Sequence, residues 1–338
     1  MNFDAVQFVD DFLRDAAGAS DVHVEPVADG YELRKRIDGL LTTDATLTTG
    51  DGRSVVARLM VMAGLLTYRQ DVPQEGRLTH GDEAVRVSVM PTTRGLRAVL
   101  RLPTPEAERS LGELGLPDNA VTHLHDFADG DSGMLLVVGP AGSGKTTTLY
   151  ALLGHIAERQ PGLSIVSLED PVERQLPGVT QIEVTPFGEL TYERALRSML
   201  RQDPQVLMLG EIRDAATARL AVQAALSGHR LVATLHAADA AGAVGRLLEM
   251  GVEPFGITGT LFGVLSQRLV RRKTDAGYRG RTPVATFVRT RDDLLRQLAA
   301  REPVDLPTLH AAGAELVRRG VTDDAELVLV LGRNDPAD

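Results

Sequence analysis

The chain has 338 residues, of which 43% are hydrophobic, and a formal net charge of −10. This length favours two or more domains over a single core, and the acidic balance argues against direct binding of nucleic acid over a large surface. Because the chain has no cysteine, disulfides, thiolate metal sites and cysteine nucleophiles are excluded. Its start lacks a basic, apolar signal segment, and no apolar run approaches the ~20 residues of a membrane-spanning helix. We therefore expect a cytoplasmic protein that meets a membrane only through a partner.

The first hundred residues predict a mixed module of helices and strands. Alternating segments at 21–26 and 31–37, joined by an Asp-Gly turn, predict a hairpin. A helix is expected over 54–66, and two strands over 84–89 and 97–102. The module opens with apolar residues at helical spacing, which predict a first helix: Phe3, Val6, Phe8, Val9, Phe12 and Leu13.

The rest of the chain predicts a sheet with helices on both faces, because short apolar runs alternate with helical patterns. These runs lie at 134–138, 164–168, 206–209 and 231–234. From about residue 240 the pattern is mainly helical, with one extended piece near 284–288. The expected organisation is an N-terminal α+β domain (1–102), a proline-rich linker (103–118), an α/β core (119–239) and a mainly helical C-terminal subdomain (240–338).

The segment GPAGSGKT at 139–146 follows the apolar run MLLVV and precedes apolar residues at helical spacing. Strand, loop and helix in this order are the context in which the pattern binds nucleotide phosphates. Its glycines let backbone N–H groups point at phosphate oxygens, and the helix start adds its positive end. Lys145 is expected to reach the β- and γ-phosphates, and the Thr146 hydroxyl to bind Mg²⁺; a glycine-rich structural turn is the alternative. The expected nucleotide-binding residues are Gly139, Pro140, Ala141, Gly142, Ser143, Gly144, Lys145, Thr146 and Thr147.

Two carboxylates follow predicted core strands, and such strand ends converge on the ligand crevice of an α/β sheet. Glu211 follows the run VLML and is expected to act on Mg²⁺ through water or to polarise the attacking water. Glu169 follows SIVSL. Capping of a following helix is the alternative for either acid. His236, at the end of the next strand, is placed to sense the γ-phosphate, whereas for His229, before that strand, a structural and a functional role remain equally open.

Four segments, taken in order, resemble the secretion and type IV pilus ATPases. They are GPAGSGKT, SLEDPVE (167–173), LRQDPQVLMLGEIRD (200–214) and SGHRLVATLHAADA (227–240). In that family these segments are the Walker A, Asp, Walker B and His boxes. The resemblance extends to ASDVHVEP (19–26), RIDGLL (36–41), VPQEGRL (72–78) and RVSVMPTTRGLRAVLRL (86–102), and near the end to RLLEMGVEPF, SQRLVRR and GYRGRTPV. It covers nearly the whole chain, in order.

The resemblance implies a RecA-like ATPase domain and a PAS-like N-terminal domain that bind ATP and Mg²⁺ between them and assemble as a homo-hexamer. Lys145 and His236 would act in catalysis, Thr146 and Glu211 would organise the metal, and which of Glu169 and Glu211 is the principal base stays open. The resemblance implies that Arg86 and Arg101 of the N-terminal domain reach the bound nucleotide and act in catalysis. It also implies that Arg197, Arg201 and Arg213 of the ATPase domain belong to the nucleotide site and to subunit contacts. A platform protein of the inner membrane is the implied partner, with no direct nucleic acid.

Two departures refine the expectation. Only KTDA stands where related enzymes carry a tetracysteine loop, so no zinc is expected, and ASDVHVEP begins at residue 19, without the long N-terminal docking region of many relatives. The sequences of the motifs resemble those of the pilus-assembly branch of the family. An assembly ATPase of this short length resembles the competence pilus motor of Gram-positive bacteria, which serves DNA uptake. Type II secretion or pilus retraction is the alternative within the family. A nucleotide-binding regulatory or scaffold protein without motor activity is the alternative of another class.

Overall fold

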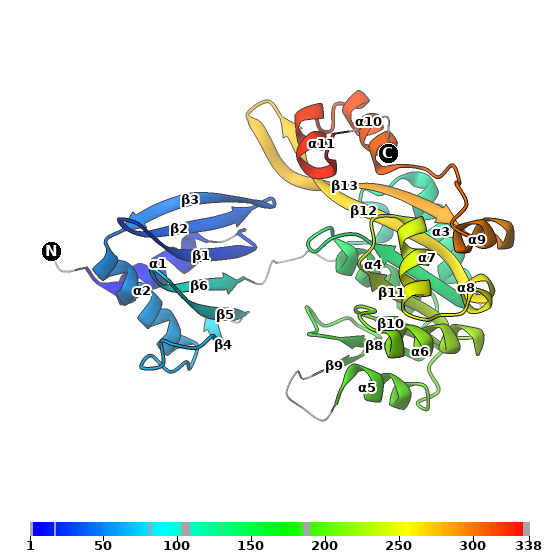
Figure 1. Cartoon of the computed structure of the whole chain (residues 1–338), viewed down its shortest axis with the longest axis horizontal. Coiled ribbons are helices and arrows are strands. Elements are labelled where there is room, and N and C mark those ends of the chain that lie inside the picture. Colours follow the sequence, from blue (N-terminus) through cyan, green and yellow to red (C-terminus); the bar gives the residue numbers. More distant parts are fainter. Residues whose placement is uncertain are drawn as a thin grey trace. The chain divides into compact units, whose positions relative to one another are not determined.

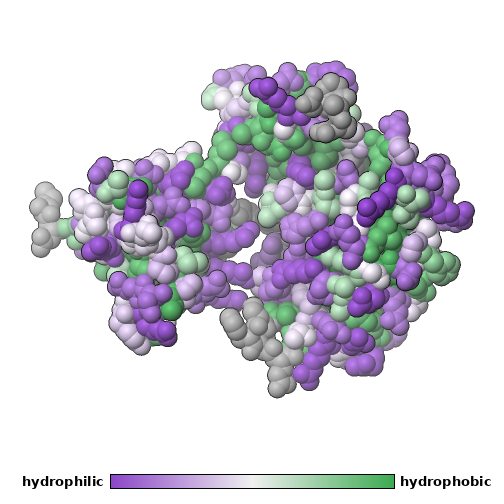
Figure 2. All heavy atoms as spheres, viewed as in Figure 1, coloured by the Kyte–Doolittle hydropathy of each residue, from purple (hydrophilic) through white to green (hydrophobic). Residues whose placement is uncertain are grey.

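The computed structural model describes residues 3–16, 18–80, 83–102, 109–130, 132–184 and 190–333. The chain divides into two compact units, residues 1–106 and 107–338 (Figure 1). No helix among the described residues is both long and apolar enough to cross a membrane. In the view of Figure 2, the surface is mainly hydrophilic, with the hydrophobic atoms in scattered groups.

The first unit is a six-stranded antiparallel sheet in the order β3-β2-β1-β6-β5-β4, with its core formed together with two helices. Alternation along the strands turns one face inward, where Val22, Leu33 and Leu100 are buried, and leaves Arg86 and Arg101 exposed on the other. The elements are α1 (Ala5–Asp15), β1 (Asp21–Val27), β2 (Gly30–Ile37), β3 (Leu40–Leu47), α2 (Thr49–Met62), β4 (Gln74–His80), β5 (Glu83–Thr92) and β6 (Gly95–Arg101).

The second unit is built on a seven-stranded sheet in the order β13-β12-β7-β11-β10-β8-β9. All its neighbouring strands are parallel except β12 and β13, which form a hairpin. Its elements are η1 (Leu111–Glu113), α3 (Asp118–Asp129), β7 (Gly133–Val138), α4 (Lys145–Arg159), β8 (Ile165–Glu169), β9 (Thr180–Glu183), α5 (Tyr192–Met199), β10 (Val206–Leu209), α6 (Ala215–Leu226), β11 (Arg230–Leu235), α7 (Ala240–Glu249), α8 (Pro254–Thr260), β12 (Leu261–Thr274), β13 (Gly277–Arg289), α9 (Asp292–Ala299), α10 (Leu309–Arg318) and α11 (Asp324–Leu331).

Helices cover both faces of this sheet, as the alternation of apolar runs and helical patterns predicted. One core cluster joins the sheet to α5, α6, α7 and α9, and the other joins it to α3, α4 and η1. The strands β7, β10 and β11 are buried along almost their whole length, which explains their uninterrupted apolar sequence. Each fully buried leucine or valine contributes about 1.5–3 kcal/mol, so the central strands are the most firmly held part of the unit. The predicted fold class, an α/β ATPase-type unit beside a smaller α+β unit, is confirmed.

Two regions differ from the expected organisation. Of the expected linker 103–118, residues 103–108 lie outside the described residues, and the remainder packs into the second unit through buried Leu111, Leu114 and Leu116. The described residues from 240 to 333 do contain five helices, but they also supply the long strands β12 and β13, which extend the main sheet. The basic run Arg268, Arg271, Arg272 and Lys273, a pattern typical of a solvated helix end, lies on strand β12.

Candidate nucleotide site

The expected boxes meet at one edge of the sheet because their strands are parallel and in register. Val138 pairs with Leu235, and Leu209 pairs with both Ala233 and Leu168. The residues that follow these strand ends are the loop GPAGSGKT, His236, Gly210-Glu211 and Glu169-Asp170. The structure thus gathers the phosphate loop, both carboxylates and one histidine at the carboxyl edge, where α/β sheets bind ligands.

The loop conformation depends on its glycines. Gly144 has φ 86° and caps the start of α4, and a Cβ at Gly139 (φ 153°) would lie 2.4 Å from the carbonyl oxygen of Gln267. Only glycine fits such positions without strain. Ser143 is buried, and its hydroxyl has no hydrogen-bond partner among the described residues. An unpaired buried hydroxyl is costly, and it suits a loop whose function is to bind a polar ligand.

Lys145 is the first residue of α4, and its ammonium folds back on the loop. Its Nζ donates to the carbonyl oxygens of Gly139 and Pro140, at 2.9 Å each. Burial lowers the pKa of Lys145; the charge of Glu211 opposes this shift, and the charge of Arg268 adds to it. Partial removal from water strengthens the attraction of this ammonium for a phosphate.

Glu211 lies at the centre of a charged cluster. Its Oε1 is 2.9 Å from Nε2 of His236, and its Oε2 accepts from Nε of Arg213 at 2.6 Å. Arg213 also donates to Oδ2 of Asp170 at 2.8 Å, and hydrogen bonding to Glu211 raises the pKa of Arg213. The Glu211 side chain keeps 19% of its surface exposed, so water reaches the carboxylate. This arrangement can position water or a hydrated metal ion.

Glu169 occupies a different environment, although it follows a neighbouring strand. The residue is only 2% exposed. Its Oε1 accepts from Ser167 Oγ at 2.5 Å and from Gln181 Nε2 at 3.2 Å, and its Oε2 accepts from the Tyr150 hydroxyl. Burial, together with this carboxylate, raises the pKa of Tyr150 well above its usual range. The Glu169 carboxylate therefore fastens α4 to β8 and β9.

Two residues that support the site were missed in the sequence. The Tyr192 hydroxyl on α5 donates to Leu168 O at 2.7 Å and accepts from the backbone N–H of Glu211 at 3.3 Å. Burial raises the pKa of Tyr192 to about 12, so the hydroxyl remains a donor. Gln267 on β12 donates from Nε2 to Ser143 O at 2.6 Å. Neither residue has a spacing signal, because each acts through a partner far away in sequence.

The residues expected to hold Mg²⁺ are compatible with it. Thr146 lies in the first turn of α4 and Glu211 at the facing strand end. No group of three or more potential metal ligands occurs among the described residues. Mg²⁺ at nucleotide sites is held by one or two protein oxygens with phosphate and water, so a hydroxyl and a partly exposed carboxylate are the donor set that it uses.

Other expected residues are not gathered at this edge. His229 precedes β11, whereas His236 follows it, and a six-residue strand separates them by about 20 Å. The Nδ1–H of His229 donates to Ala224 O at 2.8 Å, so within this chain His229 makes a structural contact at the end of β11 away from the phosphate loop. Arg197 pairs with Glu193 on α5, and Arg201 is exposed just beyond that helix.

Arg86 and Arg101 lie directly opposite each other on β5 and β6 of the first unit. Neither forms an ion pair within the described parts of the chain. Arg77 on β4 is paired with Arg86. Arg77, Arg86 and Arg101 therefore form a row across three neighbouring strands on one face of the sheet. Like charges directly opposite each other destabilise a sheet, so an anion bound beside Arg86 and Arg101 would offset the repulsion between them.

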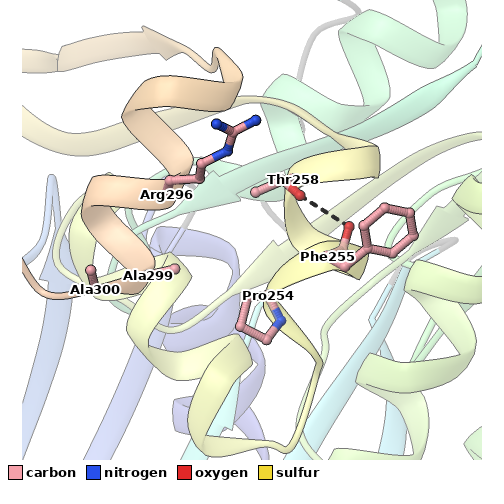
Figure 3. Close-up of a pocket in the computed structure, with 6 residues that line it drawn as sticks. All are labelled: Pro254, Phe255, Thr258, Arg296, Ala299 and Ala300. Carbon is pink, nitrogen blue, oxygen red and sulfur yellow. Dashed lines mark hydrogen bonds between the residues drawn. The ribbon is translucent and has the colours of Figure 1, made fainter.

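A separate pocket of about 450 Å³ lies between α8 and α9 (Figure 3). It is lined by Pro254, Phe255, Thr258, Arg296, Ala299 and Ala300. The Thr258 hydroxyl donates to Phe255 O at 3.1 Å, and Phe255 is 78% exposed. None of the expected nucleotide-site residues lines this pocket.

Comparisons with known proteins identify the family. The family model described as "Type II/IV secretion system protein" matches residues 5–319. The type IV pilus assembly ATPase PilB of Thermus thermophilus is 43% identical over 279 residues, which cover 79% of this chain and 31% of that protein. The type II secretion system ATPase E of Vibrio cholerae is 37% identical over 365 residues, which cover 93% of this chain and 72% of that protein. The chain thus spans less than a third of the Thermus relative.

Solved structures show the same fold. The ATPase DotB of Legionella pneumophila gives a TM-score of 0.75 at 19% identity, over 97% of this chain and 96% of that one. The pilus retraction motor PilT with bound ADP gives 0.69 at 23% identity, over 97% of each chain. The chain belongs to the type II/IV secretion system protein family, whose matched members include ATPases of type II secretion and of type IV pilus assembly.

Proposed function

We propose that this chain is a motor ATPase that hydrolyses ATP to ADP and phosphate at GPAGSGKT and drives the assembly of a pilus or pseudopilus. The observation that carries the proposal is the meeting of Lys145, Glu211 and His236 at one sheet edge. A phosphate loop alone binds nucleotide, whereas a water-accessible carboxylate opposite the loop is what hydrolysis requires. The family membership supports the same activity.

In this proposal each residue has a defined task. The loop N–H groups and Lys145 bind the β- and γ-phosphates, and Glu211 orients the attacking water and accepts its proton. His236 and Arg213 hold the two oxygens of Glu211 in place. Mg²⁺, when bound beside Thr146, neutralises charge on the phosphates. Glu169 contributes by holding α4, and with it the loop, against β8.

We propose that Arg86 and Arg101 of the first unit reach the bound nucleotide when ATP draws the units together. Their opposed guanidinium groups support this role, because an anion relieves the repulsion between them. Arginines that contact a transferring phosphoryl group contribute about 10³–10⁵ in rate. Arg197 and Arg201 would serve contacts with a neighbouring subunit. Opening after hydrolysis would convert the reaction into movement.

The activity is tested by measuring phosphate release from ATP with and without Mg²⁺. The wild-type chain should turn over ATP only with Mg²⁺, and Lys145→Ala should lower kcat by at least about 10²-fold. Lys273→Ala, on the exposed end of β12, is the matched control and should retain activity. Equal rates in wild type and Lys145→Ala would exclude hydrolysis at this loop. Nucleotide binding without turnover in every variant would instead support a regulatory or scaffold protein.

We further propose that the chain works as a homo-hexamer on the cytoplasmic face of the inner membrane. There it would act on a platform protein of a competence pilus that takes up DNA. The motif sequences, which resemble those of the assembly branch, and the short form of the chain, which resembles the competence pilus motor, support this proposal. Deletion of the gene should abolish both surface pilin and transformation. Pili that persist but fail to retract would contradict the assembly role and favour retraction.

A further inference from the structure

Arg268 lies on β12 beside the start of the phosphate loop. Ser266 of β12 pairs with Val138, the last residue of β7 before the loop. The next residues also lie close together, because a Cβ placed on Gly139 would be 2.4 Å from the carbonyl oxygen of Gln267. β12 and the segment that follows β7 therefore stay adjacent beyond the Ser266–Val138 pair. Arg268 is the next residue along β12, so its backbone runs beside the first turn of GPAGSGKT.

Gln267 fixes this part of β12 against the loop. Its side chain is 2% exposed; Nε2 donates to Ser143 O at 2.6 Å, and Oε1 accepts from Thr148 Oγ1 at 3.0 Å. Both ends of the amide are therefore used, one on the loop and one on α4. These two hydrogen bonds hold Gln267, the residue before Arg268, against the loop and α4.

The Arg268 guanidinium is partly buried and lacks an acidic partner. Its NH1 donates to Gln267 O at 3.1 Å, and no ion pair of Arg268 occurs within the described ranges. A buried charge without a counterion is unfavourable. Burial indeed lowers the pKa of Arg268, while the charge of Asp239 opposes the shift. The carbonyl oxygen of Gln267 that accepts from Arg268 also lies beside Gly139, and Lys145 Nζ donates to the carbonyl oxygen of Gly139. Both cations therefore lie near the start of the loop.

We propose that Arg268 is a catalytic residue that binds the terminal phosphate of the nucleotide held at GPAGSGKT, from within the same chain. This inference rests on the proposed ATP hydrolysis. In that reaction the water oxygen bonds to the γ-phosphorus while the bond to the bridging oxygen breaks, giving ADP and inorganic phosphate. The Arg268 guanidinium keeps its protons throughout and stabilises the negative charge on the γ-phosphoryl oxygens.

The chain offers a matched control for this residue. Arg272 lies four positions further along β12, at the irregularity in the pairing between Arg271 and Lys273, and it is exposed. It lies towards the hairpin end, away from β7. A change of Arg272 to Gln removes the same charge from the same strand without touching the loop.

The experiment compares Arg268→Gln, Arg268→Lys and Arg272→Gln in the full chain, each titrated with Mg²⁺-ADP and with the non-hydrolysable β,γ-imido analogue of ATP. Arg268→Gln should bind ADP within about twofold of wild type but weaken analogue binding about tenfold or more. Its kcat should fall by about 10³-fold. Arg268→Lys should recover part of the analogue affinity and little of the rate, because an ammonium cannot donate in a bidentate fork. Arg272→Gln should match wild type in all three measurements.

The outcomes separate this inference from the proposed function. If wild type hydrolyses ATP and Arg268→Gln matches Arg272→Gln in analogue affinity and kcat, the role of Arg268 is refuted and the ATPase stands. If Arg268→Gln weakens ADP and analogue equally, the residue supports the loop and does not bind the terminal phosphate. If wild type fails to hydrolyse ATP, the proposed function fails, while a selective loss of analogue binding would still establish the phosphate contact.

Discussion

At the nucleotide site, Glu211 and Glu169 share their chemistry but have opposite surroundings. Glu211 is partly exposed and contacts the half-exposed side chains of His236 and Arg213. Glu169 is enclosed, and both its oxygens are engaged by neutral donors. A general base must reach water, whereas a saturated buried carboxylate stabilises structure. The surroundings therefore favour Glu211 as the principal base and give Glu169 a positioning role.

The first prediction separates these roles by amide substitution. Glu211→Gln should lower kcat by about 10²–10⁴-fold and leave ADP affinity and the unfolding temperature near those of wild type. Glu169→Gln should lower the free energy of unfolding by about 1–3 kcal/mol and keep a larger share of the activity. Steady-state ATPase assays and thermal unfolding of both variants give the answer. Normal turnover in Glu211→Gln, with full stability and no turnover in Glu169→Gln, would reverse the assignment.

At the scale of the elements, the central strands were predictable and several outer ones were not. β7, β10 and β11 are continuous apolar runs between turn residues, which is the pattern of strands buried on both faces. β3 and β9 are edge strands with largely exposed sequences, LLTTDATL and TQIE, and lack an apolar alternation. β12 is buried at its start and ends in a basic tail, so its sequence has no single period and resembles the end of a helix.

The residues of the nucleotide site likewise divide into those that the sequence predicts and those that it does not. The loop and Glu211 were predictable because they directly follow apolar strands, and spacing alone locates them. Gln267 and Tyr192 could not be found, because each reaches the site from an element whose neighbour is set only by the folded sheet. His229 and His236 show the remaining ambiguity: they flank one strand, and only the direction of that strand decides which one lies at the same end as the phosphate loop.

A second prediction concerns the strand pairing in the first unit. Glu25 on β1 accepts from Arg34 at 3.0 Å and from Arg97 at 3.0 Å. Burial alone raises the pKa of Glu25, but the hydrogen bonds from Arg34, Arg97 and His23 outweigh it and the net shift is downward. The ionised form is thus favoured in the folded state, and its stabilisation is present above the unfolded pKa near 4.5 and lost as pH falls through the folded value.

Glu25→Gln should therefore be less stable than wild type at pH 7, by about 1 kcal/mol, and this difference should shrink towards zero as the pH falls below about 4. Urea unfolding of both full-length proteins between pH 7 and pH 3 measures it. Glu32→Gln, on the neighbouring strand β2, is the control. A difference that stays constant over this range would show that the carboxylate charge is not involved.

At the scale of the whole molecule, the chain combines a nucleotide site in one unit with an arginine-bearing sheet in the other. Arg86 and Arg101 face each other across β5 and β6, while Lys145, Glu211 and Arg268 belong to the second unit. We propose that hydrolysis in the second unit depends on arginines of the first. If so, a change in the first unit should affect turnover without affecting the fold of the nucleotide site.

The most direct test measures phosphate release by the full chain carrying Arg86→Gln and Arg101→Gln together. We expect kcat to fall by about 10³-fold or more while ADP affinity and thermal stability stay close to those of wild type. Arg94→Gln, in the turn between the same two strands, should keep full activity. A double variant that hydrolyses ATP at the wild-type rate would contradict the claim that the two units act on one nucleotide.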